Sequence, residues 1–193
     1  MTITDGSQDA LLDRRKRGGE WGVTAAIYAG DSIVEFLNAH PEVKTILDYG
    51  CGEGTLKPYV ESQGIDRSWT LYDPGIPEYQ TPPKGKFDLV ITTDVLEHVE
   101  PHMQEAVLDD LRRLTGKYLF NETACYLTGR RFDYGPYIGQ DLHINLRAPD
   151  DWAMQLAHKS MNLIKNKVSL TDGFKVRHLS IQEVKRVSYP VKG

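Results

Sequence analysis

The stretch that decides the fold is Ile46-Leu47-Asp48-Tyr49-Gly50-Cys51-Gly52-Glu53-Gly54. It joins a short apolar segment, Thr45–Tyr49, to a helix-like segment, Thr55–Ser62, through three closely spaced glycines. Glycine lets a backbone turn sharply and approach a ligand closely, and a helix that starts after a strand is a common site for nucleotide-type ligands. The spacing is GxGxG, whereas hydride-transfer cofactors are bound by GxGxxG. The pattern therefore predicts a strand, a glycine turn and a helix around a nucleotide-type ligand.

An acidic residue closes the next predicted strand. Ser68–Tyr72 leads directly into Asp73, a position from which a carboxylate can accept hydrogen bonds from both hydroxyls of a ribose. The alternative is a tight turn followed by an ordinary surface aspartate, which the combination of both features disfavours. Asp48, on the strand before the glycines, is a further candidate cofactor-binding residue.

Strands and helices alternate through the first two-thirds of the chain, which predicts an α/β fold with a mostly parallel sheet and helices on both faces. Ligands of such sheets bind at the carboxyl ends of the strands. Further strands are predicted at 87–92 and from 117 to 120, helices at 31–39, 101–114 and 149–164, and a final β-hairpin from 174–179 and 183–189. Asp31 or Ser32 is expected to cap the first helix, Pro101 to lie in the first turn of the second, and Gly116 to end that helix. In the third, Met161 or Leu163 is expected to face inward.

Composition fits one folded domain. The chain has 193 residues, of which 40% are hydrophobic, and a net charge of −4. We expect a flexible arm over 1–17 and a single domain over 18–193. Two cysteines, no apolar run of membrane-spanning length and no secretory signal favour a cytoplasmic protein. Residues 151–193 hold eight basic and three acidic residues. These dispersed charges indicate a solvated face rather than a landing surface for an anionic substrate.

The motifs LDYGCGEG, YDP and FDLVITTDVLEHVEP, between about Thr45 and Asn121, resemble those of class I S-adenosylmethionine (SAM)-dependent methyltransferases, in the branch that modifies small molecules and hydroxyl groups. The resemblance implies a Rossmann-like sheet with a reversed last hairpin. Only residues 74–86 separate two strands where the family has another helix and strand, so the sheet is expected to be reduced at that edge.

The same resemblance implies a cofactor site. Gly50, Gly52 and Gly54 would line the methionine and ribose parts of SAM, Asp73 would hold the ribose, and the turn at Thr92–Asp94 would lie near the methyl group. Trp21 would fold over the cofactor or pack at the edge of the core.

The element Asp94-Val95-Leu96-Glu97-His98 is similar to one that holds a divalent metal in ubiquinone-type O-methyltransferases and in small-RNA 2′-O-methyltransferases. The resemblance implies Asp94, Glu97, His98 and His143 as ligands of Mg, Mn or Zn. A metal there would lower the pKa of an acceptor hydroxyl. The alternative is that Glu97 and His98 simply line the pocket.

A second polar region, Asn121-Glu122-Thr123 with Asp141–Asn145, is expected to lie beside the acceptor. His143, His98 and Glu122 are the candidate catalytic residues, because a hydroxyl or amine acceptor needs a general base. The aromatic, cationic loop between these segments is either a substrate lid or an ordered connection.

The acceptor is predicted to be a small molecule, with RNA as an alternative. Duplex DNA is disfavoured because Thr93-Asp94-Val95-Leu96 replaces the Pro-Pro-aromatic element of amino-methylating DNA enzymes, and neither cysteine follows a proline as in cytosine C5 enzymes. An inactive SAM-binding partner subunit and a nucleotide-cofactor oxidoreductase are the other classes considered.

Overall fold

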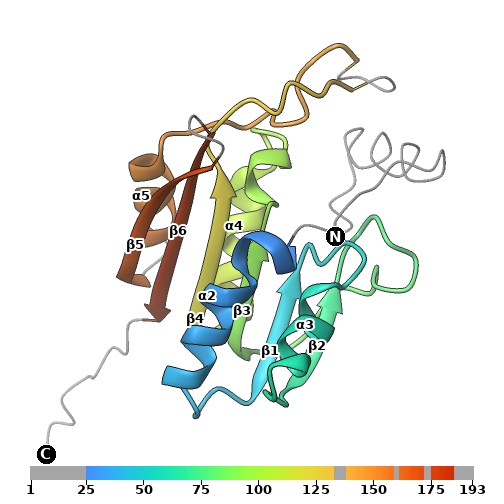
Figure 1. Ribbon diagram of the computed structural model, residues 1–193. Helices are drawn as coiled ribbons and strands as arrows, with labels where there is room; N and C mark the ends of the chain where they lie inside the picture. Colours follow the sequence, from blue (N-terminus) through green and yellow to red (C-terminus); the bar gives the residue numbers. More distant parts are fainter. Residues whose placement is uncertain (1–24, 133–137, 159–160, 172–174, 185–193) are drawn as a thin grey trace, which may run out of the picture.

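The computed structural model describes residues 25–132, 138–158, 161–171 and 175–184. These residues form a six-stranded sheet with the strand order β2-β1-β3-β4-β6-β5. Figure 1 shows helices α2 and α3 on one face of the sheet and α4 and α5 on the other. The predicted three-layer α/β fold is confirmed.

The first four strands in the sequence form the parallel part of the sheet. Strand β1 (Thr45–Tyr49) pairs with β2 (Ser68–Tyr72) and β3 (Phe87–Thr93), and β3 pairs with β4 (Thr115–Ala124). Because these strands are parallel, their carboxyl ends meet at one edge, the upper edge in Figure 1. The glycine turn, Asp73 and the Asp94 segment all lie at this edge.

Strand β2 is the last strand on its side of the sheet. Residues 74–86 form turns and bends and contain neither a helix nor a strand. The expectation of a sheet reduced at this edge is thus confirmed for the described residues.

The helices differ from the sequence predictions at their ends. Helix α2 (Ala25–Ala39) begins before Asp31, so neither Asp31 nor Ser32 caps it. Instead, Asp31 accepts a hydrogen bond from the hydroxyl of Tyr59, in helix α3 (Leu56–Ser62). Helix α4 (Gln104–Leu114) begins after Pro101. It ends because β4 starts at once, and Gly116 lies inside that strand.

The C-terminal part contains an antiparallel hairpin, as expected, but not between the predicted strands, because the predicted turn after residue 179 lies inside the single strand β6. Helix α5 (Pro149–His158) is shorter than predicted, and the residues from Met161 onward form β5 (Met161–Thr171) instead. Strand β5 pairs antiparallel with β6 (Lys175–Val184), which pairs antiparallel with β4. Leu163 is therefore a strand residue and is 40% exposed, contrary to its predicted inward position.

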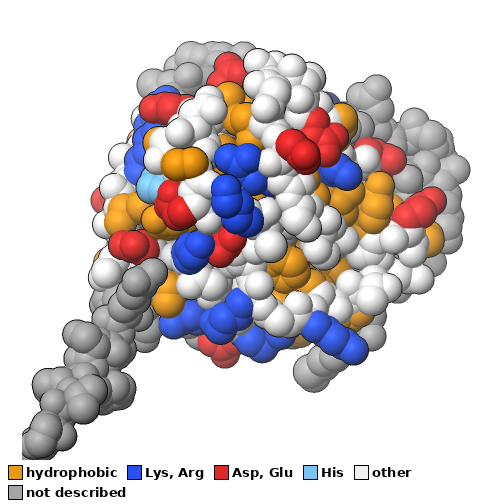
Figure 2. Space-filling model, turned by 90° about the horizontal axis from the view of Figure 1, so that it is seen from below, with side chains coloured by type: hydrophobic (Ala, Val, Ile, Leu, Met, Phe, Trp, Pro, Cys, Tyr) orange, Lys and Arg blue, Asp and Glu red, His pale blue; other side chains and the backbone are white. Residues whose placement is uncertain are grey.

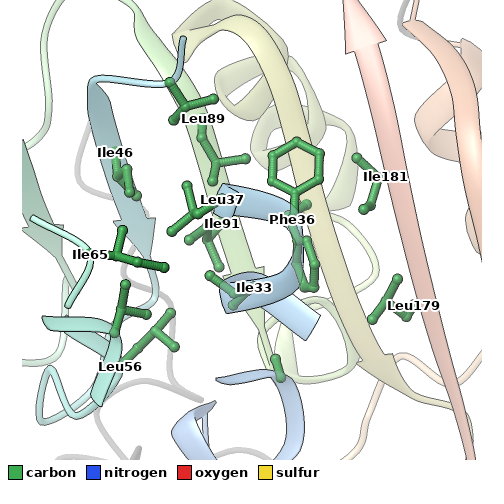
Figure 3. Close-up of a cluster of buried hydrophobic side chains, with 14 residues drawn as sticks. Ile33, Phe36, Leu37, Ile46, Leu56, Ile65, Leu89, Ile91, Leu179 and Ile181 are labelled. Carbon is green, nitrogen blue, oxygen red and sulfur yellow. The ribbon is translucent and has the colours of Figure 1, made fainter. Parts of the chain in front are cut away.

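The sheet has an apolar core on each face. On one side, α2 and α3 cover a cluster that includes Ile33, Leu37 and Leu56, which Figure 3 shows packed against Ile46 and Ile91 of the strands. On the other side, α4 and α5 contribute Leu108, Leu111, Trp152 and Leu156 to a second cluster. Two buried layers hold the strand ends rigidly, as a site at the sheet edge requires.

Figure 2 shows the molecule from below, away from the carboxyl ends of the parallel strands, with basic, acidic and apolar side chains interspersed on that face. Among the described residues, no helix combines the length and the apolar character that crossing a bilayer demands. The arm at 1–17, Trp21 and the end of the predicted hairpin at 185–189 lie outside the described residues.

Candidate active site

The glycine turn after β1 has the backbone conformation that glycine allows. Gly50, Gly52 and Gly54 all have positive φ, at 80°, 52° and 71°. A Cβ atom on Gly50 would lie 2.4 Å from Cγ2 of Val95. The turn is therefore packed directly against the segment that follows β3, and a side chain at Gly50 would be both strained and obstructed.

Asp73 organises the turn that the sequence assigns to the cofactor. Its Oδ2 accepts a hydrogen bond from the backbone N–H of Gly52 at 2.9 Å, and its Oδ1 accepts one from Gly75 at 2.8 Å. The residue is 9% exposed. Asp73 thus joins the ends of β1 and β2, and it lies where the sequence predicts the ribose.

Asp48 is buried on β1 below the glycines. Its side chain is 1% exposed, and Oδ2 has no hydrogen-bond partner among the described residues. Burial, reinforced by the charge of Asp73, raises the pKa of Asp48 to about 7. A carboxyl group in this state gains stability from a cation placed beside it.

The turn after β3 is strained at Asp94, which has a φ of 53°. The N–H of Asp94 donates to the carbonyl of Glu122 at 3.0 Å, and its carboxylate pairs with Arg177. Asp94 is therefore held at both its backbone and its side chain.

Glu122 lies within β4, so the expectation that it follows the strand is wrong. Its side chain is 4% exposed, and both of its oxygens accept hydrogen bonds from the guanidinium of Arg177. Burial raises the pKa of Glu122 to about 7, although Arg177 opposes the rise. Because the guanidinium occupies both oxygens, the geometry does not favour Glu122 as a general base.

Arg177 is the centre of a wider network. Its guanidinium also lies over the ring of Tyr28 on α2, 4.0 Å from the centroid, and its Nη1 is 3.5 Å from the hydroxyl of Tyr126. The side chain is 5% exposed. Three elements far apart in sequence, α2, β4 and β6, thus meet at this arginine.

Glu97, His98 and His143 form a second cluster. Each offers one potential ligand atom, and these atoms lie within 4.8 Å of one another. The rings of His98 and His143 meet edge to face, with centroids 4.9 Å apart. The long loop after β4 therefore brings His143 against the Glu97–His98 segment.

Backbone groups fix the orientation of both imidazoles. Nδ1 of His98 lies 2.9 Å from the carbonyl oxygen of Leu142, and Nδ1 of His143 lies 2.5 Å from that of Tyr126. A carbonyl oxygen only accepts hydrogen bonds, so each Nδ1 carries the proton and each Nε2 is the basic nitrogen. Burial lowers the pKa of His98 to about 4 and also lowers that of His143, so both rings are neutral at pH 7.

Glu97 is fully buried in its short helix η1 (Leu96–His98). Its Oε1 accepts the N–H of Ala124 at 2.8 Å, and Oε2 has no hydrogen-bond partner among the described residues. Burial raises the pKa of Glu97 well above its usual value, with a further contribution from Asp94.

The loop after β4 is ordered where the structure describes it. Asp141 accepts hydrogen bonds from the backbone of Thr128, Gly129 and His143. Asn145 donates its N–H to the carbonyl of Glu97 at 3.0 Å. These bonds explain how His143 is held, and they favour an ordered connection over a mobile lid.

The fourth predicted metal ligand, Asp94, is not part of the cluster of three, and its carboxylate pairs with Arg177 instead. Sequence reasoning missed both Arg177 and Tyr28. The one available signal for Arg177 was a single basic residue on a strand of the predicted hairpin, which does not by itself indicate a site.

Residues 24–166 match the family model described as a methyltransferase domain. The chain belongs to this family. A search of curated proteins finds no match. The predicted identity as a class I SAM-dependent methyltransferase is confirmed by the family and the fold together.

Solved structures share the fold at low sequence identity. The SAH complex of DhpI, where SAH is S-adenosylhomocysteine, has a TM-score of 0.65 at 16% identity, covering 95% of this chain and 100% of that one. Magnesium protoporphyrin IX methyltransferase from Synechocystis PCC 6803 with bound SAM has a TM-score of 0.62 at 17% identity, covering 94% and 99%. The 1,6-didemethyltoxoflavin-N1-methyltransferase of Burkholderia thailandensis reaches 0.61 at 14% identity, covering 94% and 92%.

Proposed function

We propose that this enzyme binds SAM over the glycine turn and transfers its methyl group to a hydroxyl or amine of a small molecule, with His143 as the general base. The observation that carries the proposal is the fixed, neutral imidazole of His143, which meets the ring of His98 in the segment after β3 and leaves Nε2 as its basic nitrogen. A base of this kind suits an acceptor that must lose a proton.

SAM supplies an activated methyl group, so the chain contributes mainly position and proton transfer. Gly50, Gly52 and Gly54 give the backbone space to approach the cofactor, and Asp73 is placed to hold its ribose. Asp48 and Asp94 supply negative charge near a ligand that carries a positive sulfonium and a positive ammonium. Nε2 of His143 takes up the acceptor proton as the bond from the acceptor to the methyl carbon forms and the bond from that carbon to the sulfur breaks, which leaves SAH.

The structural neighbours support a small-molecule acceptor. Two of them are named as methyltransferases of magnesium protoporphyrin IX and of 1,6-didemethyltoxoflavin, and the latter holds its small-molecule acceptor together with SAH. No observation on the described residues favours RNA over such an acceptor.

The first test is SAM binding by titration calorimetry, compared between wild type and Asp73→Asn. Loss of a charge-assisted hydrogen bond to the ribose is expected to weaken binding by about 1–3 kcal/mol. The exposed Asp66→Asn variant is the matched control and should bind as wild type does. Equal affinity in Asp73→Asn would remove Asp73 from the cofactor site.

The second test is turnover: SAH release is measured with a panel of phenols, alcohols and amines. Release with at least one of them is the expected result. SAM binding without turnover on any acceptor would instead support the inactive partner subunit.

A divalent metal is the alternative to a free base at His143, because a bound ion would occupy the same Nε2, and one observation favours it. Two imidazoles and one carboxylate, from His98, His143 and Glu97, offer ligand atoms within 4.8 Å, a donor set that fits Zn or Mn. Held there, an ion would polarise an acceptor hydroxyl. Activity that survives both EDTA and His98→Ala would exclude this role, whereas loss of activity with unchanged SAM affinity would support it.

A further inference from the structure

Arg177 lies at the carboxyl end of the parallel strands although it belongs to an antiparallel one. The register of β6 on β4 pairs Arg177 with Ala124, the last residue of β4. From there its guanidinium reaches both oxygens of Glu122 and one oxygen of Asp94. A planar guanidinium can make these contacts together, which an ammonium cannot.

Asp94, which pairs with Arg177, has an unusual backbone conformation. Among the described residues, Asp94 is the only non-glycine residue with a positive φ. Such a conformation is unfavourable for a residue with a side chain and persists when surrounding contacts determine it. Here the contacts are the carbonyl of Glu122 on the Asp94 N–H and Arg177 on the Asp94 carboxylate.

The strained turn is packed against the glycine turn. Val95 follows Asp94, and its Cγ2 lies 2.4 Å from the place where a Cβ on Gly50 would be. The Val95 side chain thus occupies the space that Gly50 leaves open. A shift of the Asp94–Val95 turn would move Val95 against Gly50 and alter the glycine turn.

We propose that Arg177 is a positioning residue for cofactor binding, which holds Asp94 and so keeps the Asp94–Val95 turn against Gly50. The inference rests on the proposed function, because it takes the glycine turn as the SAM site. Arg177 acts through Asp94 and not through contact with the cofactor. The stacked ring of Tyr28 covers the face of the guanidinium.

The test is the affinity for SAH, measured by calorimetry, which needs no acceptor. Arg177→Met is expected to raise the Kd for SAH about tenfold. Arg177→Lys is expected to raise it about threefold, because lysine keeps the charge but lacks the planar guanidinium that contacts both carboxylates. Arg113→Met, which removes a surface ion pair with Asp110, is the control and should leave the Kd unchanged. A merely structural role would lower the melting temperature of both Arg177 variants and leave the SAH affinity of the folded protein intact.

A double-mutant cycle tests the route through Asp94. Because the two residues act as one unit, Arg177→Lys combined with Asp94→Asn should bind SAH no more than about twofold more weakly than Asp94→Asn alone. If the losses of SAH affinity in Arg177→Lys and Asp94→Asn multiply in the double variant, Arg177 does not act through Asp94. If Arg177→Met fails to fold, the double-mutant cycle still tests the proposed route. It uses Arg177→Lys, which keeps a cation near the buried carboxylate of Glu122.

Failure of the proposed function can be distinguished from failure of the role proposed for Arg177. A wild-type chain that does not bind SAH overturns the proposed function and this inference with it. A wild-type chain that binds SAH, with unchanged affinity in Arg177→Lys and in folded Arg177→Met, overturns the role of Arg177 alone.

Discussion

The proposed cofactor side and the proposed acceptor side of the site are built in different ways. On the cofactor side, Gly50, Gly52 and Asp73 come from two consecutive strands and the turn between strand and helix. On the proposed acceptor side, His98 and His143 come from η1 and from the loop after β4, and the network of Arg177, Glu122 and Tyr28 joins three elements spread over the described chain. The first side depends on local backbone geometry, whereas the second depends on the pairing of distant strands.

This difference separates the effects expected from mutation. Changes on the cofactor side should act on backbone conformation and on SAM affinity. Changes at the base on the acceptor side should act on the rate of methyl transfer and leave SAM affinity intact.

The largest effect is expected at His143. Replacement by asparagine, which keeps a polar group of similar reach, should lower kcat by about 10²–10⁴, the usual contribution of a general base. The affinity for SAH should stay within about twofold of wild type, because the imidazole is held by the Tyr126 carbonyl and not by the glycine turn.

The exposed His102 supplies the control for this change, and His102→Asn should retain full kcat. Steady-state kinetics with an acceptor found by the turnover screen, together with calorimetry, measure both quantities. An undiminished kcat in His143→Asn would leave the ring with the role of anchoring the loop.

An intermediate effect is expected at Gly50, for which the chain offers a matched pair. Gly50 and Gly64 have nearly equal φ, at 80° and 79°, but only a Cβ on Gly50 meets a neighbour, Val95, at 2.4 Å. Gly64→Ala should cost about 1–2 kcal/mol of unfolding free energy through left-handed strain alone. Gly50→Ala should cost about 1–3 kcal/mol more through overpacking.

Urea unfolding measures both costs, and calorimetry with SAH should show weaker binding in Gly50→Ala only. Equal losses of stability in the two variants would mean that the contact between the glycine turn and Val95 does not constrain the site.

The sequence predicts the cofactor side well because its signals are local. A strand, three glycines and an acid at the end of the next strand follow one another within Thr45–Asp73, and β1 and β2 have the predicted bounds. The positive φ angles of Gly50, Gly52 and Gly54 explain why these three positions are glycine. The reduced sheet edge likewise follows from the short connection at 74–86.

The acceptor side could not be predicted to the same extent. Arg177 reaches Glu122 only because β6 pairs with β4 in one particular register, and no local pattern states that register. The error at Met161 and Leu163 has a similar origin. Their spacing fits a helical stripe, but the β-branched Ile164 and Val168 suit a strand, and pairing with β6 settles the outcome.

The smallest effect on ligand affinity is expected from pH, through Asp48 on the proposed cofactor side. In the cofactor-free protein, burial raises the pKa of Asp48 from the usual 3.8 to about 7. Between these values the folded chain binds the proton more strongly than the unfolded chain does. The contribution of Asp48 to the unfolding free energy therefore falls as pH rises from 4 to 7, and Asp48→Asn should remove that slope.

Binding of SAH is expected to favour the ionised form of Asp48 over the protonated form. We expect the ammonium of bound SAH to lie beside Asp48 and to favour the ionised carboxylate, so binding at pH 7 should release about half a proton. For the same reason, the affinity should rise about threefold between pH 6.5 and 7.5. Calorimetry in two buffers of different ionisation enthalpy measures the proton release directly. Asp48→Asn should show no release and a flat pH profile, whereas Asp66→Asn should behave as wild type. A release that persists in Asp48→Asn would assign the titrating group elsewhere and separate Asp48 from the cofactor side of the site.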